Sequence, residues 1–158
     1  MITINGVKVY TFNELMAAAQ SKAVNDNREY ALYPDWHEFI LEKWNEKLND
    51  MGISNPKVSY SGFFSQGDGA SFTGDIEDPV IFCRKNGIRM TVPFIVATTG
   101  DDKMYFNIKR NTHQYYHENT IDLYVVNYKD EKIAIQLYKA IDRQIKSICR
   151  QIYNELSD

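Results

Sequence analysis

Apolar residues recur every three or four positions in two long segments of this 158-residue chain, and that spacing predicts amphipathic helices. One helix should begin near Pro34-Asp35 and end before Gly52, because proline suits a first helical turn and glycine suits a C-cap. Its apolar face holds Trp36, Phe39, Ile40, Trp44, Leu48 and Met51. A longer helix should begin at Asp130. Its apolar stripe contains Ile133, Leu137, Ala140, Ile141, Ile145, Ile148, Cys149, Ile152 and Leu156.

The N-terminal segment predicts a short hairpin followed by a first helix. Two β-prone runs flank Asn5-Gly6, a dipeptide that favours tight hairpin turns. Thr11 lies three residues before Glu14, which is the spacing of a capping box, in which each side chain bonds the other residue's backbone amide. We expect the helix that starts there to continue to about Asn25.

The middle of the chain alternates β-prone runs with turn residues, which predicts a sheet. The expected strands cover residues 57–64, 70–76, 79–84, 88–97, 103–110 and 120–128. Asn86-Gly87 and Gly100-Asp101-Asp102 lie in the predicted turns. Connections this short cannot hold a parallel crossover, so the strands should form an antiparallel meander. We therefore predict a single α+β domain over residues 1–158, with N-terminal helices and a long C-terminal helix packed on the sheet.

Composition limits the classes of function. Hydrophobic residues make up 44% and charged residues 25% of the chain, values typical of a soluble globular domain. The net charge of −3 argues against a generic nucleic-acid-binding protein, which carries an excess of lysine and arginine. Cys83 and Cys149 have no metal-ligand spacing and are expected to be reduced thiols of a cytoplasmic protein. No apolar run is long enough to predict a membrane span.

The stretch SYSGFFSQGDGASF, residues 59–72, concentrates glycine and aromatic residues. It lacks the lysine of a P-loop, the following helix of a dinucleotide-binding turn and the acidic ladder of an EF-hand. A tight turn over residues 66–69, between two paired strands, explains it best. Strand alternation should then bury at least one phenylalanine ring and expose another. The alternative is a polar loop whose Gln66 and Asp68 contact a ligand or a partner.

The same stretch carries a family resemblance. Tyr60 to Phe72 resembles, nearly residue by residue, the signature [YF]-S-G-F-W-S-Q-G-D-G-A-[CS]-F of a widespread family of small phage and prophage proteins. Phe64 stands where that family more often has tryptophan. HQYYHENT and ICRQIYNEL, at residues 113–120 and 148–156, resemble the family's later histidine- and tyrosine-rich strand and its closing helix. The signature is specific for a family, whose members are largely uncharacterised, and not for an activity.

The resemblance implies an origin on a mobile element, and the cytoplasm of an infected or lysogenic bacterium as the place of action. Small phage accessory proteins commonly bind and disable host machinery, including defence systems such as CRISPR–Cas. The implied partner is a host protein or a protein–nucleic-acid complex, and no cofactor is expected. These expectations rest on likeness to a family rather than on the chemistry of a site.

The later segment KRNTHQYYHEN is also rich in polar and aromatic residues. On a strand, His113, Tyr115 and His117 would point to one face, because side chains repeat every two residues. A carboxylate such as Asp68 or Glu118 could add a metal ligand. However, the two histidines would stand about 13 Å apart along a strand, which is too far for shared chelation. We therefore predict no metal site and a partly exposed aromatic face.

Binding of single-stranded nucleic acid is a further alternative. Basic and aromatic residues that could neutralise and stack a single strand are Lys103, Lys109, Arg110, His113, Tyr115 and Tyr116. The overall charge and the lack of an RNP-like aromatic pattern oppose this alternative. Direct nucleic-acid binding is therefore not the favoured function.

Catalysis has little support in the sequence, so we predict no catalytic residues. Cys83 lies in the apolar run VIFC, and the acidic group at residues 75–78 has no paired base. We expect a non-enzymatic binding protein, without predicting its oligomeric state. Its proposed binding residues are Phe64, Gln66, Asp68, His113, Tyr115 and His117. The alternative is a small-molecule or nucleotide binder, or a cryptic enzyme, with a pocket around SQGDG that joins Asp68 to His113 or His117.

Overall fold

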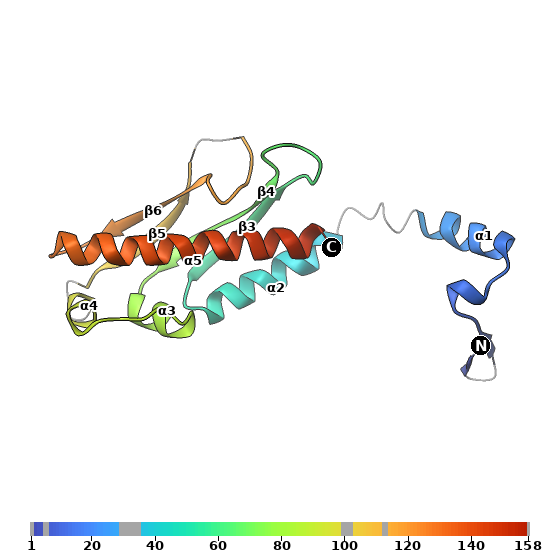
Figure 1. The fold of residues 1–158 in the computed structure, drawn as a ribbon, viewed down its shortest axis with the longest axis horizontal. Coiled ribbons are helices and arrows are strands. Elements are labelled where there is room, and N and C mark those ends of the chain that lie inside the picture. The colour runs from blue at the N-terminus through green and yellow to red at the C-terminus, as the bar shows by residue number, and fades with distance from the viewer. Residues whose placement is uncertain (1, 5–6, 29–35, 99–102, 112–113, 158) are drawn as a thin grey trace. The chain divides into compact units, whose positions relative to one another are not determined.

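The computed structural model describes residues 2–4, 7–28, 36–98, 103–111 and 114–157. The chain forms two compact units, residues 1–36 and 37–158, and each is described by itself (Figure 1). A single domain over the whole chain stays a prediction. Three segments named above lie outside the described residues: Asn5-Gly6, Pro34-Asp35 and Gly100-Asp101-Asp102.

The N-terminal unit contains the predicted hairpin and a helix. Strands β1 (Ile2–Ile4) and β2 (Val7–Val9) pair antiparallel, as the flanking β-prone runs predicted. A short 3-10 helix, η1 (Phe12–Glu14), follows them. The α-helix α1 (Ala17–Arg28) completes the unit.

The predicted capping box forms, but it caps η1 rather than α1. Within the capping box, the backbone N–H of Thr11 donates to the Glu14 carboxylate at 2.9 Å. The Glu14 amide also donates to the Thr11 carbonyl at 2.9 Å, which is the turn bond of η1. Leu15 then takes an extended backbone, which ends the turn before α1 begins. The prediction of one continuous helix from Thr11 to Asn25 is therefore wrong at its start.

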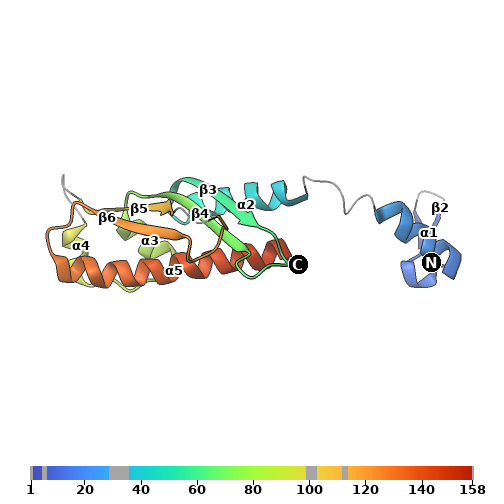
Figure 2. The same ribbon diagram turned by 90° about the horizontal axis from the view of Figure 1, so that it is seen from above.

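The larger unit is a sheet with a long helix packed across one face (Figures 1 and 2). Its four strands pair antiparallel in chain order: β3 (Ser54–Ser61), β4 (Gly69–Ile76), β5 (Tyr105–Arg110) and β6 (Ile121–Val126). Helix α5 (Glu131–Ser157) begins after Asp130, as predicted, because the Asp130 carboxylate accepts the amides of its first turn. The predicted α+β class, antiparallel order and C-terminal helix on the sheet are confirmed.

Two segments predicted as strands, 79–84 and 88–97, contain helices instead, in the connection between β4 and β5, and residues 88–91 have no regular structure. The helices are α3 (Pro79–Lys85) and α4 (Val92–Ala97). The Asp78 carboxylate accepts from the Ile81 amide at 2.9 Å and so caps α3, and proline occupies the first turn. Capping therefore outweighs the β-propensity of the VIFC run.

The dipeptide Asn86-Gly87 ends α3 instead of turning a hairpin. Gly87 has a φ of +68°, a conformation that glycine adopts without the steric cost of a side chain. The Ile88 amide donates to the Cys83 carbonyl at 2.8 Å, the long bond of a Schellman motif. Gly52 ends helix α2 (Trp36–Asp50) in the same way, with the Ile53 amide bonded to Leu48 at 3.0 Å.

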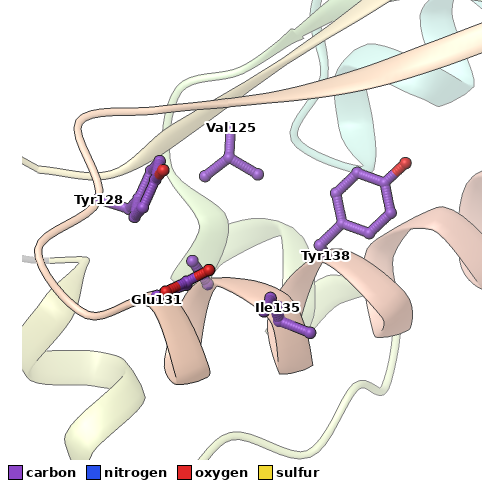
Figure 3. Close-up of a pocket in the computed structure, with 6 residues that line it drawn as sticks. Val125, Tyr128, Glu131, Ile135 and Tyr138 are labelled. Atoms are coloured by element: carbon purple, nitrogen blue, oxygen red, sulfur yellow. The ribbon is translucent and has the colours of Figure 1, made fainter.

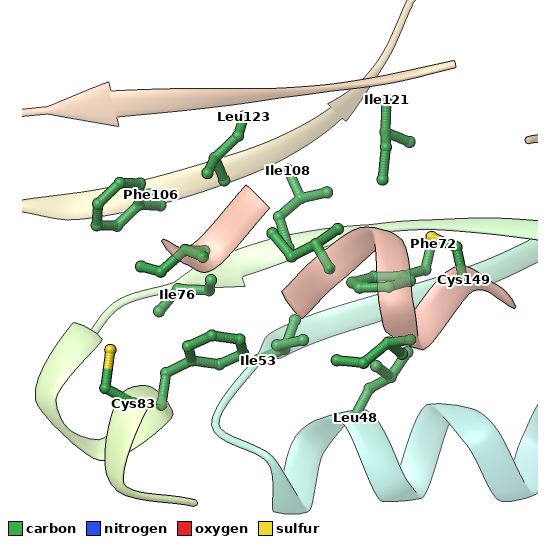
Figure 4. Packing of buried hydrophobic residues seen from close by; sticks show 14 of the residues in the cluster. Leu48, Ile53, Phe72, Ile76, Cys83, Phe106, Ile108, Ile121, Leu123 and Cys149 are labelled. Carbon is green, nitrogen blue, oxygen red and sulfur yellow. The ribbon is translucent and has the colours of Figure 1, made fainter. Parts of the chain in front are cut away.

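The core lies between α5 and the sheet (Figure 4). Helix α5 turns one stripe inward, and eight of its residues are buried: Ala134, Leu137, Ile141, Ile145, Ile148, Cys149, Ile152 and Leu156. The sheet contributes alternate residues, among them Phe72, Ile76, Phe106 and Ile108. Ile133 and Ala140 of the predicted stripe are only half-buried. The C-terminal helix is therefore docked by the face that its periodicity predicted.

Helix α2 packs beside β3 and against the end of α5. Asn45 accepts the Val58 amide at 3.1 Å, which satisfies a donor on the outer edge of β3. The Trp44 indole donates to Glu155 at 3.0 Å. Trp44 is buried, whereas Phe39, on the predicted apolar face, is 72% exposed. No helix among the described residues is both long and apolar enough to cross a membrane.

Candidate functional site

The loop between β3 and β4 is held in shape by the carboxylate of Asp68. Ser61 and Gly69 form the last pair of the two strands, so residues 62–68 make the connection, which is longer than the predicted turn. One Asp68 oxygen accepts the amides of Phe64 at 2.8 Å and Ser65 at 2.6 Å. The Asp68 amide in turn donates to the Ser65 carbonyl at 3.0 Å. The loop is therefore ordered by bonds among its own residues.

Two glycines in this loop are needed for its geometry. Gly62 has a φ of +36°, and a Cβ there would lie 2.8 Å from the Asp68 carboxylate. Gly67 has a φ of +114°, and a Cβ there would lie 3.5 Å from the ring of Tyr115. A side chain at Gly62 would therefore collide with the group that orders the loop.

The segment of residues 114–120 lies against this loop, and together they form what we call the loop pair (residues 62–68 and 114–120). Ser61 joins the two: its hydroxyl accepts the Tyr116 amide at 3.0 Å and lies 3.1 Å from the Tyr116 carbonyl. A Cβ on Gly69 would lie 3.0 Å from that same carbonyl. The close approach of the two segments thus requires glycine at residue 69.

Residues 114–120 form bends and a turn, so they are not the strand on which Tyr115 and His117 would share one face. β5 ends at Arg110, whose guanidinium lies 4.1 Å from the Tyr116 ring centre and bonds its hydroxyl at 3.1 Å. The Thr120 hydroxyl accepts the His117 amide at 2.9 Å, and Glu118 pairs with Arg150 of α5 at 2.8 Å. Alternation along a strand therefore does not govern which way Tyr115 and His117 point.

The three phenylalanines of the motif have three different environments. Phe72 belongs to the core and is 1% exposed. Phe63 stacks between Tyr60 and Tyr153, with ring-centre distances of 5.5 and 5.8 Å. Phe64 is 100% exposed. The prediction that one ring would be buried while another reached the surface is confirmed.

The other predicted binding residues are brought together in part. Gln66 is exposed on the same loop as Phe64, and Tyr115, across the loop pair, is 42% exposed. Asp68 and His117 are half-buried, and their contacts are within the loop pair. His113 lies outside the described residues. The binding roles of all these residues stay predictions.

A shallow hollow of about 240 Å³ lies between the two loops. It is lined by Gly67, Tyr115, His117, Asn119 and Thr120, and Asp68 does not line it. The Nδ1 atom of His117 accepts the Asn119 amide at 3.1 Å, so that nitrogen already has a partner. The described residues contain no group of three or more histidine, cysteine or acidic side chains placed to hold a metal ion.

Both thiols lie inside the packed unit. Burial raises the pKa of Cys83 to about 12, and burial, helped by the charge of Glu118, raises the pKa of Cys149 to about 12. Because the thiolate is the reactive form, these cysteines are poor nucleophiles at neutral pH.

The sequence did not predict a separate apolar cavity of about 220 Å³ at the start of α5 (Figure 3). It is lined by Val125, Tyr128, Glu131, Ala134, Ile135 and Tyr138. A strand end, a connection and two helical turns supply these residues, so no local motif marks the cavity. The hydrogen bond between Ser61 and Tyr116 was not predicted either, because 55 positions separate the two residues and no local motif links them.

Comparison with known proteins gives a family and no activity. No curated protein and no solved structure matches the chain. The sequence profile of a family described as "Domain of unknown function (DUF8835)" matches residues 36–158, which include the sheet, α5 and both segments of the loop pair. The chain therefore belongs to the DUF8835 family.

Proposed function

We propose that this chain is a non-enzymatic binding protein whose contact surface is the loop pair. The observation that carries the proposal is the full exposure of Phe64 on a loop that is fixed by the Asp68 carboxylate. Single exposed apolar residues are ordinary on protein surfaces, so exposure alone would not support it. The support comes from an aromatic ring that is both exposed and held on an ordered loop.

The packing of Phe63 strengthens this argument. Phe63 is fixed between Tyr60 and Tyr153, so the residue before Phe64 cannot move freely. A loop that is ordered before binding loses less conformational entropy when it meets a partner. Aromatic residues are also frequent energetic anchors of protein interfaces. Phe64, with Tyr115 beside the hollow, therefore fits the centre of a protein contact.

Polar side chains of the loop pair hold its backbone in place. The Asp68 carboxylate accepts two backbone amides, and the His117 Nδ1 accepts a third. These groups support the shape of the surface, which is the role that the proposal gives them.

We further propose that the partner is a host protein or a protein–nucleic-acid complex, which this chain, as a phage- or prophage-derived accessory protein, inhibits. The support is the resemblance of Tyr60 to Phe72 to the signature of small phage proteins. A defence system such as CRISPR–Cas belongs to the class of targets that such proteins disable. This part of the proposal rests on likeness to a family rather than on the geometry of the loop pair.

Site-specific photo-cross-linking in bacterial cells tests the binding surface. A photoreactive phenylalanine replaces Phe64 in one variant and Phe39 in the matched control, because Phe39 is also a well-exposed aromatic residue, on α2. The proposal predicts a discrete host-protein adduct from position 64 and none from position 39. The same adducts from both positions, or none from position 64, would contradict it.

The inhibitory step needs its own assay. Cells that carry an active defence system should restrict a phage less when they also produce the wild-type chain. Phe64→Ala should restore restriction, provided that the variant melts like the wild type. Cross-linking without any relief of restriction would retain the binding surface and reject inhibition of that system.

A further inference from the structure

The outward face of α5 carries a line of positive charge that the whole-chain net charge of −3 conceals. Its cations are Lys132, Lys139, Arg143, Lys146 and Arg150, which we call the basic stripe. Successive members are seven, four, three and four residues apart, close to whole turns of a helix with 3.6 residues per turn. They therefore lie on one side of α5, opposite the stripe that packs on the sheet.

Most of this charge is available to a partner. In the described part of the chain, Lys132, Lys139 and Arg143 have no ion pair, and all three are exposed. Lys146 pairs with Asp142 at 3.0 Å, and Arg150 pairs with Glu118 at 2.8 Å. A shallow hollow of about 380 Å³ runs beside the stripe.

Opposite charge is gathered on a different helix. Glu38, Glu42, Glu46 and Asp50 follow each other every four residues along α2, and all are exposed. The chain is therefore not uniformly acidic. A polyanion can approach α5 although the protein as a whole repels it weakly.

The side chains within the stripe indicate which polyanion fits. Gln136 and Asn154 lie on the same side of α5 and are exposed. Ile135, between Lys132 and Lys139, is 46% exposed, and the half-buried Tyr138 lines the hollow, but no large apolar side chain is exposed from Lys139 to Arg150. Protein interfaces usually need such an anchor, whereas phosphate oxygens are bound by lysine, arginine and amide side chains. Stacking on single strands would require exposed aromatic rings, and residues 139–150 expose none.

We propose that the basic stripe binds the phosphate backbone of double-stranded nucleic acid without regard to sequence. From Lys132 to Arg150 the stripe is about 27 Å long, at about 1.5 Å per helical residue. That length matches about eight base pairs, at about 3.4 Å per pair. This proposal is independent of the contact surface at the loop pair.

Fluorescence anisotropy with a labelled 16-base-pair duplex tests the proposal on the full chain. If three to five phosphates are neutralised, log Kd should change with log salt with a slope of about 2.7 to 4.5. Raising the salt concentration from 50 to 200 mM should therefore weaken binding by about 40-fold to 500-fold. No detectable binding at 50 mM salt would overturn the proposal.

A charge-reversal pair assigns the binding to α5. The double variant Lys139→Glu, Arg143→Glu should weaken duplex binding at least tenfold and lower the salt slope by about 1.8. The matched control, Lys57→Glu with Lys85→Glu, changes the net charge equally at exposed lysines outside α5 and should bind nearly as the wild type does. Equal losses in both variants would show a net-charge effect and overturn the assignment. Phe64→Ala should leave duplex binding unchanged, which separates this test from that of the loop pair.

Three further outcomes would reject the duplex as the partner. Tighter binding of the same sequence as a single strand would point to stacking instead. Equal competition by poly-glutamate of the same charge would point to an acidic protein. The chain could also self-associate at 50 mM salt, and the double variant Lys139→Glu, Arg143→Glu could abolish that self-association. This result would show that the basic stripe binds the acidic face of α2 in a second copy of the chain.

Discussion

The packed face of the sheet and the loop pair at its end are both rich in aromatic residues, but the exposure of those residues differs between the two regions. On the sheet, Phe72 and Phe106 are 1% and 0% exposed and contribute to one continuous core. In the loop, Phe63 packs against neighbouring rings while the very next residue, Phe64, is fully exposed. Burial explains the first group, and it does not explain Phe64.

This difference separates what the fold needs from what a partner could use. Transfer of apolar surface out of water stabilises the core, so each buried ring contributes to folding. An exposed ring contributes little to folding, whereas the backbone that presents it is held by Asp68. Substitutions in the core should therefore lower stability, and substitutions of Phe64 should change binding alone.

The largest expected effect is in the core. Ile141 lies on α5 and is 0% exposed. Replacing it by aspartate should lower the free energy of unfolding by about 4 kcal/mol or more, because a charge would be buried without a partner. Gln136→Asp, on the exposed face of the same helix, should cost less than about 1 kcal/mol. Urea unfolding measures both. An Ile141→Asp variant with the wild-type midpoint would show that α5 is not docked.

The loop scaffold should respond more weakly than the core. Asp68→Ala removes the acceptor of two amides and should lower the free energy of unfolding by about 0.5–2 kcal/mol, by analogy with helix caps. Asp68→Asn keeps one acceptor oxygen and should recover part of that loss. Gln66→Ala, on the exposed side of the same loop, should change stability by less than about 0.5 kcal/mol. Thermal melts measure both variants. A larger loss of stability in Gln66→Ala than in Asp68→Ala would contradict this description of the loop.

A pH-dependent contact joins α2 to α5. The hydrogen bond from Lys43, supported by the Trp44 indole, lowers the pKa of Glu155 below its ordinary value of 4.5. A carboxylate with a lowered folded-state pKa stabilises the fold above pH 4.5, and this contribution disappears as the pH falls through the folded pKa. Because the pair is exposed and screened, the effect should be at most about 1 kcal/mol.

Glu155→Gln checks the sign of this effect. The variant should be less stable than the wild type at pH 7, and the difference should shrink as the pH falls below 4.5, as measured by urea unfolding at each pH. A difference that grows in acid would mean that the Glu155 pKa is raised rather than lowered. Glu46→Gln, on the exposed face of α2, is the matched control and should show no such trend.

Much of the fold could be predicted from periodicity. The apolar stripe of α5 spans about seven turns, and most of the residues predicted for it are buried. A helix this long must turn one face to the sheet. The hairpin at the N-terminus and the pairing of β3 with β4 followed from turn residues in the same way. These predictions rest on local patterns that tertiary contacts did not override.

The errors came from weighing one local signal against another. The VIFC run suggested a strand, although Asp78-Pro79 before it is a helix start and Asn86-Gly87 after it can close a helix. Capping groups satisfy backbone amides that otherwise have no partner, so they decided the structure of residues 79–85. The helix signals on both sides of the VIFC run are therefore stronger than its β-propensity.

The loop pair could be predicted only in part. Alternation suggested that the phenylalanines would divide between buried and exposed positions, but not that Phe64 would be the exposed one. Gly62 ends the strand geometry just before Phe63, so alternation no longer applies there. The position of residues 114–120 depends on the bond between Ser61 and Tyr116, a contact between distant parts of the chain that no local pattern encodes.

The most direct test of the binding surface compares stability with affinity in one variant. Phe64→Ala should change the free energy of unfolding by less than about 0.5 kcal/mol, because the ring is fully exposed. The same variant should bind the host protein identified by cross-linking at least tenfold more weakly, a loss of about 1.4 kcal/mol or more in binding free energy. Phe39→Ala is the control and should change neither quantity appreciably. Wild-type affinity in Phe64→Ala would contradict the account, because it would remove the residue on which the proposed contact depends.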